Sequence, residues 1–200
     1  MMPLFTRPDA WTGGSYELAL EYGRMSPDAL ARVVAHLWSH PTLEGCYLDH
    51  SREPTGQRRV SPAEVDPGLC LRGLATLPNG DVTTCLSSVV AEPEATWVYF
   101  GSPMGALGHS YPVGAYPFDD GLPLDWRNPL DGWLLDMASF AFAVHPFRLG
   151  LVGWVDPLNT SAAEVASSGA PDPRWEGYIV PSGGALEWYP PNAGAPITLS

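Results

Sequence analysis

The sequence contains no lysine, because all ten of its basic residues are arginines. A chain without an ε-amino group cannot form its own Schiff base with a carbonyl substrate. Nor can it supply the phosphate-binding lysine of a P-loop or use a Ser-Lys catalytic dyad. The absence of this one residue type therefore excludes three reaction classes for the chain acting alone.

Cysteine is scarce, and the three thiols, Cys46, Cys70 and Cys85, show no Cys-x-x-Cys spacing. An odd number without that spacing argues against both a disulfide framework and a zinc ribbon. We therefore expect reduced cysteines that pack as small hydrophobic side chains. The sequence also lacks the HExxH, G-x-S-x-G and G-x-G-x-x-G motifs, so no motif identifies a reaction.

Long hydrophobic runs are absent as well. No stretch approaches the roughly 20 apolar residues that a membrane-spanning helix needs. The first nine residues, Met-Met-Pro-Leu-Phe-Thr-Arg-Pro-Asp, lack the apolar centre of a signal peptide. These two observations predict a cytoplasmic protein that does not enter a membrane.

Basic residues are outnumbered, with 22 acidic side chains against ten arginines and a formal net charge of −12. Such a charge repels nucleic acid and anionic membranes and attracts cationic partners at long range. We therefore expect no nucleic-acid partner, and we expect any protein partner to be basic.

The hydrophobic pattern predicts one α+β domain spanning residues 1–200, because 45% hydrophobic content in 200 residues can bury a sizeable core. Alternation from Ser15 to Tyr22 predicts a strand with one covered face. Asn79-Gly80 predicts a hairpin whose two-residue turn would place Cys85 opposite Leu74. The expected strands are 15–22, 45–49, 69–77, 82–91, 96–100, a buried strand that follows the second helix and ends by Asp156, 175–180 and 185–189. The expected irregular segments are 51–67, 101–127 and 159–173.

Two helices are predicted, the first with one apolar stripe and the second so apolar that we expect it to be mostly covered. One begins at Pro27 and ends near His40, and the second is capped by Asn128 with Pro129 at its first position. We therefore expect one mainly antiparallel or mixed sheet of about six to eight strands with both helices packed on one face. Each helix is followed by His-Pro-x-x-x-Gly, at 40–45 and at 145–150. This repeated motif indicates one of two origins. Either the chain contains two pseudo-repeated helix–strand units, or histidine and proline arose independently at both places because they favour the end of a helix.

The long segment 101–127 is rich in Gly, Pro and aromatic residues, and structureless loops of this length in compact domains are usually functional or disordered. Aromatic rings flanked by carboxylates suit a binding surface for a cationic partner. The alternative is that the rings cover the core beneath the loop. We predict an immunity-like or inhibitor-like binding protein, monomeric or homodimeric and without a cofactor. Its expected binding residues are Tyr111, Tyr116, Asp119, Asp120 and Trp126.

Three other functions stay open. A small hydrolase would use His109 with Asp119 and Asp120 as base and acids. A metal-dependent enzyme would use His36, His40 and Asp49, although the helical pattern places both histidines on the solvent side, so that no metal is the preferred interpretation. A structural or self-assembling role fits the same composition.

Overall fold

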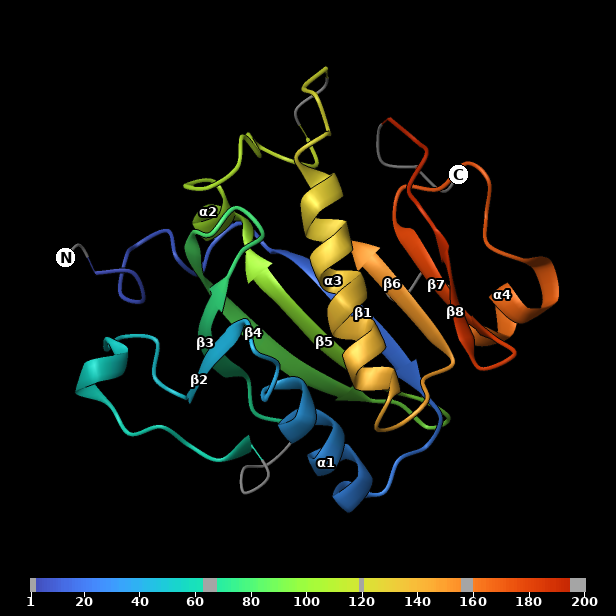
Figure 1. Ribbon diagram of the computed structural model, residues 1–200, viewed down its shortest axis with the longest axis horizontal. Helices are drawn as coiled ribbons and strands as arrows, with labels where there is room; N and C mark the ends of the chain where they lie inside the picture. The colour runs from blue at the N-terminus through green and yellow to red at the C-terminus, as the bar shows by residue number, and fades with distance from the viewer. Residues whose placement is uncertain (1–2, 63–67, 119–120, 156–159, 195–200) are drawn as a thin grey trace.

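The computed structural model describes residues 3–62, 68–118, 121–155 and 160–194, which form an α+β fold around one eight-stranded sheet (Figure 1). The strands are β1 (Ser15–Tyr22), β2 (Leu43–Tyr47), β3 (Leu71–Thr76), β4 (Val82–Ala91), β5 (Thr96–Pro103), β6 (Leu149–Gly153), β7 (Gly177–Ser182) and β8 (Ala185–Tyr189). The helices are α1 (Pro27–Leu37), α2 (Met104–Leu107), α3 (Arg127–Phe142) and α4 (Ala162–Ser168), with the 3-10 helix η1 (Pro54–Gly56).

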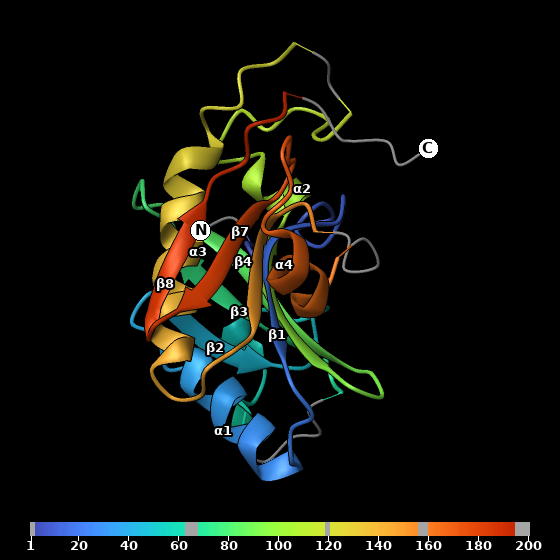
Figure 2. The same ribbon diagram turned by 90° about the vertical axis from the view of Figure 1, so that its right-hand side faces the viewer.

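The strand order is β2-β3-β4-β5-β1-β6-β7-β8, and all neighbouring strands run antiparallel. Helix α1 carries the chain from central β1 to edge strand β2, and a meander through β3 and β4 returns it to β5 beside β1. Helix α3 then leads to β6 on the other side of β1. Figure 2 shows α1 and α3 on one face of the sheet and α4 on the other. The predicted antiparallel sheet with two helices on one face is confirmed.

Central strand β1 shows why the sheet is covered on both faces. Tyr16, Leu18, Leu20 and Tyr22 are at most 1% exposed and pack in the core beneath α1 and α3. Ala19 points to the opposite face, in a smaller core that includes Val165 of α4. The alternation seen in the sequence is therefore the alternation of the pleat. The proposed duplication of helix–strand units stays a prediction.

The β3–β4 hairpin differs from its predicted register by one residue. The Gly80 amide donates to the Leu77 carbonyl at 2.9 Å, and the Leu77 amide donates to the Asp81 carbonyl at 2.8 Å. Gly80 has a φ of +88°, as expected where a turn is followed by a left-handed residue in a three-residue loop. The additional loop residue places Cys85 opposite Gly73 instead of Leu74.

Helix boundaries also differ from expectation. Helix α3 begins at Arg127, and its N-cap residue Trp126 makes no side-chain capping bond, so Asn128 lies within the first turn and is not the cap. The segment 159–173, expected to be irregular, contains α4. Its N-cap Ser161 accepts a hydrogen bond from the Glu164 amide at 3.3 Å. The sequence Ser-Ala-Ala-Glu has the pattern of a capping box, but the Glu164 carboxylate accepts from the Ser161 hydroxyl and not from the Ser161 amide.

Gly177 of β7 has no room for a side chain, because the aromatic ring of Trp188 lies close to its backbone. A Cβ atom at Gly177 would lie 1.9 Å from Cη2 of Trp188. We expect Gly177→Ala to displace this ring and lower the free energy of unfolding by about 1–3 kcal/mol. At exposed Gly132 of α3, a Cβ atom would meet no other atom within 4 Å, so Gly132→Ala should instead stabilise by about 0.5–1 kcal/mol. Urea unfolding checks both changes; equal stability of the two variants would contradict the packing argument.

Candidate binding site

The segment 101–127, predicted to bind a partner, forms one wall of a cavity of about 530 Å³ at one end of the sheet. The other walls come from the turn before β1 and the residue after β6. Glycine, proline and aromatic residues dominate the lining. It consists of Gly13, Met104, Gly105, Gly108, Tyr111, Pro112, Val113, Gly114, Ala115, Tyr116, Phe118 and Trp154.

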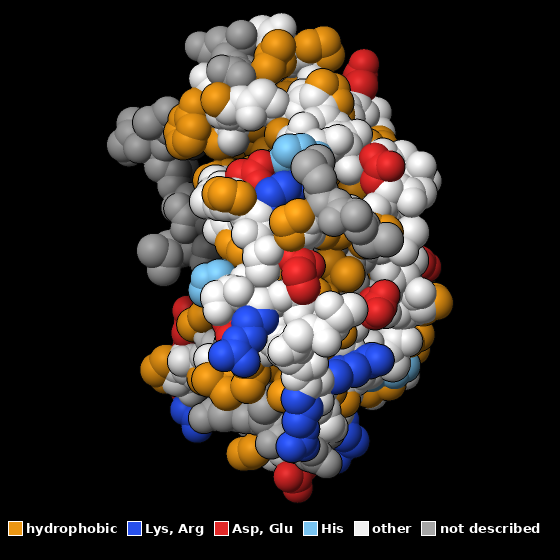
Figure 3. All heavy atoms as spheres, turned by 90° about the vertical axis from the view of Figure 1, so that its left-hand side faces the viewer, with side chains coloured by type: hydrophobic (Ala, Val, Ile, Leu, Met, Phe, Trp, Pro, Cys, Tyr) orange, Lys and Arg blue, Asp and Glu red, His pale blue; other side chains and the backbone are white. Residues whose placement is uncertain are grey.

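Large apolar side chains are exposed in this segment. Phe118, which lines the cavity, is 78% exposed, and Leu122 is 44% exposed. The Phe118 ring contacts Trp154 edge-on, with the ring centroids 6.4 Å apart. Figure 3 shows hydrophobic side chains gathered at the upper end of the molecule, and Figure 1 places the loop that follows α2 at this end. An exposed phenylalanine next to an apolar cavity is unusual for a surface that meets only water.

The predicted binding residues differ in how deeply the structure buries them. Tyr111 is partly buried and lines the cavity. Tyr116 and Trp126 are each 6% exposed and pack edge to face, with ring centroids 5.0 Å apart. Asp119 and Asp120 lie outside the described residues. Of the aromatic residues named from the sequence, two therefore pack in the core beneath the loop, as the alternative interpretation held.

A buried arginine organises these rings. Arg127 is 3% exposed; its Nε donates to the Tyr16 hydroxyl at 3.1 Å and its Nη2 to the Trp175 carbonyl at 2.8 Å. The guanidinium carbon lies 4.9 Å from the ring centroid of Trp175 and 5.7 Å from that of Tyr116. The Tyr16 hydroxyl in turn donates to Oδ1 of Asp131. Burial raises the pKa of Asp131 to about 6, although the Tyr16 and Arg127 contacts oppose that shift.

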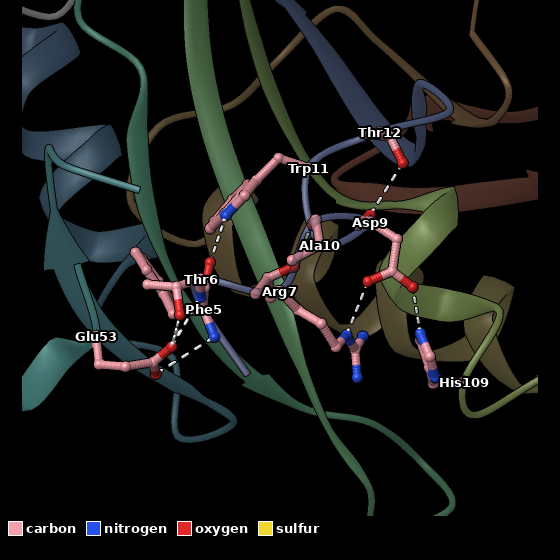
Figure 4. Close-up of polar contacts among 10 residues, drawn as sticks. Phe5, Thr6, Arg7, Asp9, Ala10, Trp11, Thr12, Glu53 and His109 are labelled. Atoms are coloured by element: carbon pink, nitrogen blue, oxygen red, sulfur yellow. Dashed lines mark hydrogen bonds and ion pairs between the residues drawn. The ribbon is translucent and has the colours of Figure 1, made fainter. Parts of the chain in front are cut away.

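The N-terminal segment is held against the sheet close to this cavity (Figure 4). The Glu53 carboxylate accepts from the Phe5 amide at 3.3 Å and from the Thr6 amide and hydroxyl at 2.7 Å each. Asp9 accepts from Arg7 Nε at 3.0 Å and contacts Nε2 of His109. The His109 contact is the main cause that lowers the pKa of Asp9. The histidine proposed for a hydrolase is thus paired with an acid 100 residues away, which no local motif indicates.

No family model, no curated protein and no solved structure matches this chain. Among the helices within the described ranges, none has the length and apolar character to cross a membrane.

The two histidines of the proposed metal site join α1 to α3. His36 stacks on Phe140 with ring centroids 4.0 Å apart, and its Nε2 lies 3.1 Å from the Phe140 carbonyl. His40 is 3% exposed, with Nδ1 2.8 Å from the Thr42 hydroxyl and Nε2 3.1 Å from Asp136 Oδ2. The expectation that His40 faces solvent is wrong, because α3 covers this end of α1.

Asp49 does not join these histidines. Its Oδ1 accepts from the amide and hydroxyl of Ser51, and its Oδ2 lies 3.3 Å from Arg52 Nε. Within the part of the chain that the structure describes, no three His, Cys, Asp or Glu side chains gather in a way that could hold a metal ion.

An acidic hollow of about 490 Å³ lies near α4, and the sequence did not indicate it. Buried Glu21 accepts from Arg148 Nη2 at 2.7 Å and from the Ala162 amide at 2.6 Å, so its charge is compensated internally. Three further glutamates reach the hollow from a turn and from α4. The lining consists of Glu21, Glu92, Glu94, Ala95, Trp97, Arg148, Thr160, Ser161, Ala163 and Glu164.

The cavity beside segment 101–127 is lined mainly by glycine, apolar and aromatic residues. It can therefore take up an apolar side chain or ring. The charged groups beside it, Asp9 and His109, are paired with each other at its edge. The buried arginine beneath Tyr116 holds the inner rings in place.

Proposed function

We propose that this protein is an acidic binding protein, immunity-like or inhibitor-like, that holds a basic polypeptide through segment 101–127. The observation that carries the proposal is the pairing of exposed Phe118 with the apolar cavity it lines. Binding energy at protein interfaces concentrates in a few aromatic anchors and the pockets beside them. Phe118 is such an anchor, and the cavity offers room for an apolar side chain of the partner.

Charge supplies the second part of the proposal. A net charge of −12 attracts a basic partner from a distance and speeds encounter more than it strengthens the final complex. The polypeptide that binds here is therefore expected to have a basic surface around an apolar contact. Its association should slow as salt is added, because exposed charges are screened over about 10 Å at 0.1 M salt.

A photo-crosslinking amino acid at position 118 tests this function in the protein's own host. We expect a covalent adduct with one basic protein, identified by mass spectrometry. The same residue at position 90 is the control, because Val90 is 46% exposed but lies on β4. With the partner in hand, Phe118→Ala should weaken binding by about tenfold or more, which corresponds to about 1.4 kcal/mol.

Val90→Ala should leave that affinity unchanged. Equal adduct yields at positions 118 and 90, or unchanged affinity of Phe118→Ala, would contradict the proposed binding surface. A partner that is acidic, or one whose association rate does not respond to salt, would contradict the electrostatic part alone.

A further inference from the structure

The two edges of the sheet differ in how their backbones are covered. At edge strand β2, the Val60 amide donates to the Cys46 carbonyl at 2.9 Å, so the chain that follows η1 lies against that strand. At the other edge, β7 is the one strand of the described chain that pairs with β8. Figure 2 shows this edge strand in red. An uncovered strand edge is a place where another chain can add a strand.

The turn between β7 and β8 fixes which backbone groups of β8 point outward. Gly183 and Gly184 have φ angles of +58° and +86°, as in the type I′ turn of a two-residue hairpin. Ser182 faces Ala185 across this turn, so these two residues form a hydrogen-bonded pair. Along an antiparallel hairpin, such pairs alternate with pairs that exchange no hydrogen bond.

By this alternation, Leu186 and Trp188 direct their N–H and C=O groups away from β7. Leu186 lies opposite Pro181, which has no N–H to donate, so the pairing agrees with the alternation. Among the described residues, no group forms a hydrogen bond with these outward N–H and C=O groups. A strand added at this edge would bond to all of them.

The side chains of β8 define what such a strand must contain. Leu186 and Trp188 are partly buried and pack against the core beneath α1 and α3, whereas exposed Glu187 points to the opposite face. In an antiparallel strand added here, the residue opposite Glu187 belongs to a pair without hydrogen bonds. The two Cα atoms of such a pair are about 4.5 Å apart, so their side chains lie close together.

The charge of Glu187 decides which strand fits. If β8 of a second copy bonded to all the outward groups, the two Glu187 carboxylates would face each other, which is unfavourable. An arginine or lysine opposite Glu187 is favourable, and apolar residues on either side of it would extend the layer of Leu186 and Trp188. We propose that β8 binds an extended basic segment of another polypeptide as an antiparallel strand. Its residues opposite Trp188, Glu187 and Leu186 are apolar, basic and apolar.

Two blocked pentapeptides test the proposal on the unmodified protein. Thr-Val-Arg-Val-Thr and Thr-Val-Glu-Val-Thr, each acetylated and amidated, are titrated while the backbone amide signals of Leu186 and Trp188 are followed by NMR. We expect saturable shifts with the arginine peptide, and binding of the glutamate peptide weaker by about fivefold or more. Absence of saturation with the arginine peptide, or equal affinity for both peptides, would overturn the proposal.

Methylation of peptide nitrogens tests whether the arginine peptide binds as a strand. In the proposed register the amides of both valines donate to β8, whereas the amide of the arginine points away from it. Methylation of the two valine nitrogens should therefore abolish saturable binding, and methylation of the arginine nitrogen should leave it measurable. Binding that survives methylation of both valine nitrogens would contradict strand addition.

Glu187→Arg reverses the charge at this edge. The Glu187 side chain is exposed and accepts from the Tyr189 hydroxyl at 2.8 Å, so we expect the variant to fold and to prefer the glutamate peptide. Glu44→Arg makes the same reversal at an exposed position of β2, and this matched control should bind as the unmodified protein does. An unchanged preference in Glu187→Arg would contradict the role of Glu187.

Two further measurements separate this edge from other occupants and surfaces. Shifts of the Leu186 and Trp188 signals on dilution of the protein alone would show that a second copy occupies the edge, which contradicts the choice of a basic segment. Phe118→Ala should bind the arginine peptide normally, because the cavity beside segment 101–127 has no residue of β8 in its lining. Loss of peptide binding in Phe118→Ala would place the peptide in that cavity and contradict β8 as its site.

Discussion

Arg127→Met is expected to lower the free energy of unfolding by about 3–5 kcal/mol, because removal of one member of a buried charge pair leaves the other uncompensated. Arg127 lies among Tyr16, Tyr116 and Trp175, and its charge faces Asp131 through the Tyr16 hydroxyl. The substitution also removes the donor to the Trp175 carbonyl. Guanidinium chloride unfolding at pH 7 measures the loss.

Two further variants show whether the loss comes from charge. Arg32→Met on α1 is the control, since Arg32 is exposed, and it should change stability by less than about 0.5 kcal/mol. The double variant Arg127→Met with Asp131→Leu removes both charges and should recover at least half of the loss. A double variant as unstable as the sum of its single changes would contradict the electrostatic explanation and leave lost packing as the cause.

Glu17→Gln is expected to stabilise the folded protein at pH 8 by about 2–4 kcal/mol. Glu17 lies on the face of β1 opposite α3, between Gly101 of β5 and Gly153 of β6. Among the described residues, no group forms a hydrogen bond or ion pair with its carboxylate. Burial alone raises the pKa of Glu17 to about 8. The side chain keeps partial contact with solvent, so we expect less than the full effect of such a shift.

The pH dependence of stability follows from this pKa. Between about pH 4.5 and 8 the folded chain retains a proton at Glu17 that the unfolded chain has released, so stability falls as pH rises through this range. Asp131 contributes a fall of the same sign between about pH 3.8 and 6. In Glu17→Gln the fall above pH 6 should disappear, and below pH 6 only the smaller fall that Asp131 causes should remain.

Thermal unfolding from pH 4 to pH 9 follows both effects. Glu44→Gln on β2 is the matched control. Because Glu44 is exposed, this substitution should leave the dependence of thermal stability on pH unchanged. Equal pH curves for the unmodified protein and Glu17→Gln would show that Glu17 is ionised in the fold without cost.

Local patterns were sufficient to predict most of the elements. Alternation of side chains specifies β1, and a Ser-Pro start with a regular apolar stripe specifies α1, since both depend on neighbours in sequence. The same reasoning proposed 101–127 as a binding segment, and residues of that segment line an apolar cavity. The residues whose roles were misjudged are those whose environment comes from distant segments.

Sequence alone determined the α+β class, the exclusion of lysine chemistry and the antiparallel meander, because composition and short-range periodicity are written along the chain. Only the tertiary structure decided that Arg127 and His40 are buried and that Glu17 is partly buried, since other strands or a second helix enclose them. It also decided that α3 and the segment after β8 form one cavity, although these parts lie about 60 residues apart. Burial and cavities are properties of segments brought together in space, which no local pattern specifies.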